Sequence, residues 1–196
     1  MTFRLGLTGS IGMGKSTTAQ LFVEEGCALW DADAAVHRLY SRGGAAVAPM
    51  ARAFPGAVER GEVQRARLKE IIARDPAALR RIEAIVHPLV AEDRAAFLAA
   101  QTADVTVLDI PLLFETGATG FDAVVVVSAP PETQRARVLA RGTMSDAEFE
   151  TILARQMPDS EKRARADYVI ETDTPDHARA QVRTVMADIR RRIAHA

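Results

Sequence analysis

With 196 residues, the chain is long enough for one full hydrophobic core, or for a core that carries small lobes. Its composition, 48% hydrophobic and 26% charged, is that of a globular protein and excludes a disordered or fibrous chain. The net charge of −1 and the lack of any bilayer-length apolar run argue against nucleic acid and membrane partners. The single cysteine, Cys27, and the lack of a signal peptide ahead of the first strand favour the cytoplasm; the oligomeric state stays open.

The first predicted elements are a strand and a phosphate-binding loop. The apolar run at 3–7 predicts a buried strand, and residues 17–25 predict a helix that ends at Gly26. Between them, residues 9–16 have the sequence GSIGMGKS, which fits the pattern G-x-x-x-x-G-K-[ST]. Strand, glycine loop and helix thus follow one another in the order that this pattern requires.

The pattern has a direct chemical meaning. Glycines let backbone N–H groups turn inward around phosphate oxygens, and the start of a helix adds partial positive charge. We expect Lys15 to bridge the β- and γ-phosphates and the Ser16 hydroxyl to hold Mg²⁺, so the ligand is a nucleoside triphosphate. The alternative is a glycine turn with an exposed lysine. The residues expected to bind ATP are Gly12, Met13, Gly14, Lys15, Ser16 and Thr17.

Further short apolar runs predict the other strands of one sheet. Alternating strands and helices predict an α/β fold, a parallel sheet covered by helices on both faces. Ligands of such sheets bind beyond the carboxyl ends of the strands, where the phosphate loop, Asp31-Ala32-Asp33 and Asp109 would meet. The strands are expected at residues 27–30, 105–108, 123–127 and 168–170.

The helical segments are of unequal length. A helix at 34–40 is followed by another at 45–54, and residues 65–101 are helical in character with an interruption or kink at His87-Pro88. So long an insertion between two strands predicts an accessory lobe or lid rather than a crossover helix. Later helices are expected to begin at Pro130-Pro131, at the capping box Ser145-Asp146-Ala147-Glu148, and at Thr174-Pro175.

Taken together, these segments resemble those of the dephospho-CoA kinases, P-loop kinases related to nucleoside monophosphate kinases. The resemblance implies transfer of the ATP γ-phosphate to the 3′-hydroxyl of dephospho-CoA, giving CoA and ADP, the last step of CoA biosynthesis. It also implies a five-stranded parallel P-loop core, a helical CoA-binding lobe at 34–101 and a small lid at 142–165, the core being residues 1–33, 102–141 and 166–196. The matching segments span nearly the whole chain: residues 6–17, Asp31-Ala32-Asp33, His87-Pro88, Pro111-Leu112-Leu113-Phe114-Glu115, Gln156, Lys162 and 166–170.

Two positions depart from the family's pattern. Ser10 stands where the loop usually has its second glycine, and we expect serine to permit the same turn. Glu171-Thr172 replaces the Asp-Asn that commonly follows the last strand near the adenine, so the adenine contacts stay open.

Three aspartates are candidates for the chemistry. Asp33 is the candidate general base or hydroxyl-orienting group, since a carboxylate can take the acceptor's proton; its alternative is an N-cap for a helix beginning at Ala34. Asp31 is expected to contact a Mg²⁺-bound water or to support the structure. Asp109 ends an apolar run as a Walker-B aspartate does, and either helps to hold Mg²⁺ through water or caps the strand end.

The remaining candidates concern the acceptor and the lid. Pro111 and Glu115 are expected to shape the acceptor site, and His87 either contacts the acceptor or ends a helix. His37 with Arg38 either neutralises acceptor phosphate or lies on a solvated helix face. Arg141 is the first choice for a lid arginine on the transferred phosphate. Behind it come Arg137, Arg155 and Lys162, for which a solvated face is favoured.

Two other functions compete with this one. Another small P-loop kinase, acting on a nucleotide, nucleoside or small metabolite, would be distinguished by an acceptor panel. A nucleotide-dependent switch would need features that are absent: the sequence has no Asn-Lys-x-Asp guanine-reading segment, and Asp109 is followed by Ile110 instead of a second acidic residue.

Overall fold

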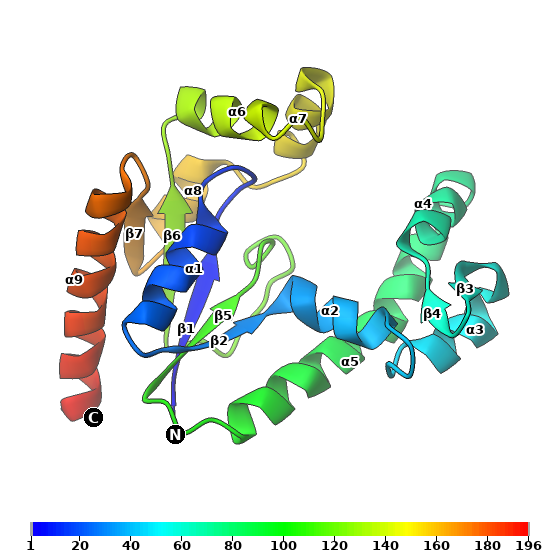
Figure 1. The fold of residues 1–196 in the computed structure, drawn as a ribbon, viewed down its shortest axis with the longest axis horizontal. Coiled ribbons are helices and arrows are strands. Elements are labelled where there is room, and N and C mark those ends of the chain that lie inside the picture. The colour runs from blue at the N-terminus through cyan, green and yellow to red at the C-terminus, as the bar shows by residue number, and fades with distance from the viewer. Residues whose placement is uncertain (1, 196) are drawn as a thin grey trace. The chain divides into compact units, whose positions relative to one another are not determined.

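The computed structural model describes residues 2–195, which form two compact units. One unit contains the chain up to Trp30 and from Gln101 onward, and the other is Asp31–Ala100. Within the described residues, no helix combines the length and the hydrophobicity that a membrane span requires. Each unit is described by itself below, with the labels of Figure 1.

A five-stranded sheet is the centre of the first unit. Its strand order is β2-β5-β1-β6-β7; β1 pairs in parallel with β5 and β6, and β6 with β7. The predicted five-stranded parallel sheet is confirmed, and each strand lies within two residues of its expected bounds. The strands are β1 (Phe3–Thr8), β2 (Ala28–Asp31), β5 (Val105–Asp109), β6 (Ala123–Ser128) and β7 (Tyr168–Glu171).

Helices α1 (Lys15–Glu24) and α9 (Pro175–Ala194) contact each other and pack on one face of this sheet (Figure 1). Alternate residues of the strands, such as Leu5 and Leu7, point into the core that these helices close. Gly6 therefore faces the opposite side, where a Cβ atom would lie 2.9 Å from the Leu113 side chain. The loop after β5 thus lies directly against the sheet.

The other helices of this unit follow β6. The capping box at Ser145 is confirmed, because its hydroxyl accepts from the Glu148 N–H while the Glu148 carboxylate accepts from the Ser145 N–H. Helix α9 begins at Thr174-Pro175 as expected, and the Thr174 hydroxyl caps it by accepting from the His177 N–H. The basic stretch around Lys162 is itself helical, which the sequence did not reveal. These helices are α6 (Pro131–Ala140), α7 (Asp146–Leu153) and α8 (Asp159–Arg165).

The second unit is mainly helical, with its own apolar core around Leu39, Met50 and Ile82. Of the two outcomes predicted at His87-Pro88, an interruption or a kink, the interruption is wrong: a single helix runs through Pro88. Burial of Ile82 and Val86 on one stripe of that helix outweighs the hydrogen bond that proline removes. The elements are α2 (Ala32–Tyr40), α3 (Val47–Ala53), a 3-10 turn η1 (Pro55–Ala57), β3 (Val58–Glu59), β4 (Glu62–Val63), α4 (Arg65–Arg74) and α5 (Ala78–Ala99).

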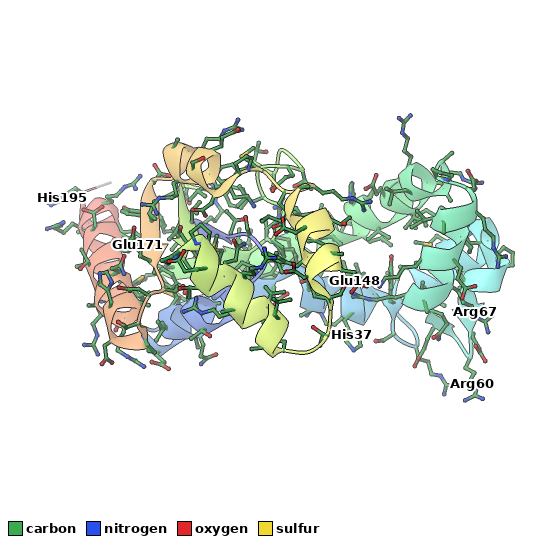
Figure 2. All side chains as sticks on the ribbon, turned by 90° about the horizontal axis from the view of Figure 1, so that it is seen from above. His37, Arg60, Arg67, Glu148, Glu171 and His195 are labelled. Atoms are coloured by element: carbon green, nitrogen blue, oxygen red, sulfur yellow. The ribbon has the colours of Figure 1, made fainter. Side chains whose placement is uncertain are left out.

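The tight β3–β4 hairpin of this unit yields a stability prediction. Its turn residues Arg60 and Gly61 both have positive φ, 52° and 80°, although a left-handed backbone is unfavourable for arginine. The Arg60 side chain points away from the unit (Figure 2). Because Asn-Gly is the preferred pair in such a turn, Arg60→Asn should raise stability by about 0.5–1 kcal/mol. Chemical denaturation measures the change, and Arg60→Ala, which keeps the strain, should gain nothing.

Candidate active site

The phosphate loop joins β1 to α1, as the spacing predicts. Gly12 and Gly14 have φ values of 79° and 90°, and a Cβ on Gly12 would lie 2.5 Å from the Val138 side chain, so α6 supports the loop directly. Ser10 is buried and adopts the turn without a positive φ, which confirms that serine is permitted there. Within residues 2–195, no side chain caps the N-terminus of α1. Its first N–H groups therefore suit an anion.

Lys15 and Asp109 form an ion pair at this loop. Asp109 is the last residue of β5 and is almost completely buried, while Lys15 is the first residue of α1. The carboxylate thus holds the lysine beside the loop, and nucleotide phosphate would compete with it for the ammonium group. Ser16 is the next residue of α1 and is exposed. The Ser16 hydroxyl and the Asp109 carboxylate supply the oxygen ligands that Mg²⁺ prefers, so the residues present fit the ion.

Thr172 contacts the phosphate loop and also lines a cavity of about 450 Å³. Its buried hydroxyl donates to the Met13 carbonyl at 2.7 Å and accepts from Arg137 Nη1 at 2.8 Å. Arg137 was expected on a solvated face; that prediction is wrong, because the guanidinium is bound to Thr172 and lines the cavity. The cavity lies against the start of α1 and is also lined by Gly14, Thr17, Arg141 and Pro175.

Arg141 and Arg155, both named as lid candidates, are exposed. Arg141 directly follows α6 and lines the same cavity, so its guanidinium has access to a bound ligand. Arg155 lies just beyond α7.

Glu115, from the loop after β5, lies close to buried Lys162. Lys162 Nζ lies 2.9 Å from Glu115 Oε1, which also accepts from the Met157 N–H at 2.9 Å. Burial raises the pKa of Glu115, but the Lys162 ammonium and the Met157 amide outweigh it, and the net pKa is lowered. Lys162 was expected to be solvated; it is fully buried, so that prediction is wrong. Pro111 lies at the start of this loop, where its carbonyl accepts from the Thr8 hydroxyl at 3.1 Å.

The second unit contains the other candidates. Asp31, not Asp33, caps α2: its carboxylate accepts from the Ala34 N–H at 2.9 Å. The reading of Asp33 as the cap is therefore wrong, and Asp33 lies exposed in the first helical turn. Two roles were predicted for Asp31, contact with a Mg²⁺-bound water or structural support, and this helix cap is structural support.

Three basic side chains of this unit are candidates for contact with the acceptor. His37 is exposed on α2 (Figure 2), and the neighbouring Arg38 forms an ion pair with Asp93 of α5 at 2.6 Å. His87 is exposed in the middle of α5. The interpretation of His87 as a helix-ending residue is wrong, because the helix continues for about three more turns, to Ala99.

Sequence reasoning missed the role of Gln134 and left that of Thr172 open. Buried Gln134 donates from Nε2 to the Ile11 carbonyl at 2.7 Å. Thr172 was visible only as a departure from the family pattern, and Gln134 had no signal, because both act on the loop from more than 100 residues away.

Comparisons with known proteins cover nearly the whole chain. A family model described as dephospho-CoA kinase matches residues 3–177. A dephospho-CoA kinase of Ruegeria pomeroyi is 70% identical over 197 residues, 100% of both chains. A crystal structure of a Thermus thermophilus protein has a TM-score of 0.85 and 35% identity, covering 95% of this chain and 97% of that one. A dephospho-CoA kinase from Campylobacter jejuni, 21% identical, shares the fold with a TM-score of 0.66 over 96% of this chain and 97% of that one.

Proposed function

The chain belongs to the dephospho-CoA kinase family, and we infer that it transfers the γ-phosphate of ATP to the 3′-hydroxyl of dephospho-CoA, giving CoA and ADP. It is thus an ATP-dependent phosphotransferase, and the reaction is the last step of CoA biosynthesis. The observation that supports this most directly is the phosphate loop, which presents the uncapped start of α1 beside Lys15 and the buried Asp109 carboxylate. We further propose the cytoplasm as its location, where ATP is available.

ATP binding uses the first unit. We propose that the N–H groups of residues 12–17 bind the phosphates and that Lys15 moves from Asp109 to the β- and γ-phosphates. The adenosine would occupy the 450 Å³ cavity, in contact with Arg137 and Thr172. Ser16 would hold Mg²⁺ directly, with Asp109 or Asp31 acting through water. The ion would neutralise negative charge on the β- and γ-phosphates.

Phosphoryl transfer then needs an aligned acceptor. The 3′-oxygen forms the new bond to the γ-phosphorus while the bond from that phosphorus to the β–γ bridging oxygen breaks. We propose that Asp33 takes the hydroxyl proton and that Arg141 stabilises charge on the transferred group. The acceptor would be bound by the lobe of residues 34–101, with the lid at 142–165 excluding water. The proposed acceptor residues are Asp33, His37, His87, Pro111 and Glu115.

Coupled ADP release tests this function. The full chain is incubated with ATP and Mg²⁺, with and without dephospho-CoA, and ADP is measured continuously. We expect ADP release to require dephospho-CoA and to match CoA formation mole for mole. ATP turnover that ignores the acceptor, or that responds better to another member of an alcohol and nucleoside panel, would contradict the proposal.

A further inference from the structure

Two glutamines hold the two peptide groups on either side of Ile11 in the phosphate loop. The Ile11 N–H donates to Gln156 Oε1 at 3.1 Å, and the Ile11 carbonyl accepts from Gln134 Nε2 at 2.7 Å. Gln134 is buried on α6, and Gln156 lies between α7 and α8. Ile11 directly precedes residues 12–17, whose N–H groups are proposed to bind phosphate, so the orientation of its peptide groups constrains theirs.

The segment that carries Gln156 also holds the loop after β5. We call residues 156–162 the bridging segment. Its Met157 N–H donates to Glu115 Oε1, and its buried Lys162 Nζ lies 2.9 Å from the same oxygen. The bridging segment therefore contacts the phosphate loop through Gln156. It contacts the loop of residues 110–115 through Met157 and Lys162.

We propose that Gln156 is a positioning residue, which orients the phosphate loop and keeps it in register with the loop after β5. A loop with two glycines at positive φ is conformationally permissive, so its N–H groups keep their direction only if neighbouring peptides are anchored. Gln156 provides that anchor through a hydrogen bond that never touches the nucleotide. The inference rests on the proposed function only in taking the ligand to be a nucleotide with a β-phosphate.

Gln156→Met tests the anchor, because methionine matches glutamine in length but accepts no comparable hydrogen bond from Ile11. Loss of the partner should speed hydrogen exchange of the Ile11 amide and raise the Kd of ADP, each about tenfold. Exchange at Leu5 in β1 should not change. ADP binding is measured by calorimetry without acceptor, so a failure of the acceptor-dependent reaction would refute the proposed function and leave this result standing.

Two further variants separate anchoring from packing. Gln156→Glu keeps an acceptor oxygen and should restore slow exchange at Ile11. Ser160→Ala, an exposed position of the same bridging segment, should leave both exchange and ADP affinity unchanged. The inference fails if Gln156→Met leaves Ile11 exchange and ADP affinity as they were. It fails equally if Leu5 loses as much protection as Ile11, or if Gln156→Glu behaves like Gln156→Met.

Discussion

Replacing Asp33 by asparagine should lower kcat of the acceptor-dependent reaction about 1,000-fold while the Kd of ATP changes less than about twofold. Asparagine keeps the size of the side chain but cannot take a proton from the 3′-hydroxyl. The structure removes the competing explanation for this residue, since Asp31 caps α2 and Asp33 is exposed in the first turn. Loss of turnover in Asp33→Asn would therefore not arise from a lost helix cap.

The measurement needs two assays and one matched control. ATP binding is measured by calorimetry without acceptor, and turnover by coupled ADP release with dephospho-CoA. Asp75→Asn makes the same chemical change at an exposed residue of the same unit, where an asparagine oxygen can still accept from the Ala77 N–H. That variant should retain full turnover. Near-normal kcat in Asp33→Asn would remove Asp33 from the mechanism.

The parts of the site that the sequence predicted are those encoded locally. Residues 3–17 contain the first strand, the glycines, the lysine and the start of the helix in one continuous stretch, so their spacing alone defines the phosphate loop. Asp109 was predictable for a related reason: it ends an apolar run, and parallel strands place their carboxyl ends along one edge of a sheet. Its pairing with Lys15 follows from that placement.

The parts that the sequence left hidden depend on contacts between distant residues. The Ile11 amide meets Gln156 across 145 positions, and Thr172 meets Met13 across 159. No periodicity or composition marks such a pair. The stretch around Lys162, with glutamate before it and arginine after it, has the composition of a solvated helix, yet the fold buries this one lysine completely. The long helix through Pro88 was hidden because tertiary burial overrode a local breaker.

Replacing either member of the buried pair Glu115 and Lys162 should have the largest effect on stability. The loss should be larger when Glu115 is replaced than when Lys162 is replaced. Lys162 is fully buried, whereas the Glu115 side chain is 17% exposed and keeps the Met157 N–H as a partner. Glu115→Gln leaves an ammonium group buried without a counter-charge and should cost about 3–5 kcal/mol. Lys162→Met leaves the carboxylate with an amide and some water, and should cost about 1–3 kcal/mol.

The double variant Glu115→Gln/Lys162→Met distinguishes charge burial from packing. It removes both charges and keeps the Met157 N–H acceptor, so it should be more stable than Glu115→Gln by about 2 kcal/mol or more. Chemical denaturation at neutral pH measures all four proteins. A double variant no more stable than Glu115→Gln would show that the pair matters through shape and not through charge.

The pH dependence of Glu115→Gln gives an independent check with a fixed sign. In the parent, the Glu115 carboxylate has a lowered pKa, so its contribution to stability is complete above the unfolded pKa and is lost as pH falls through the folded one. Glutamine does not titrate, so the stability deficit of Glu115→Gln relative to the parent should be complete at neutral pH and should shrink as pH falls through the acid range. Chemical denaturation of both proteins at a series of pH values measures this difference. A deficit that stayed constant across the acid range would mean that the charge of Glu115 contributes nothing to stability.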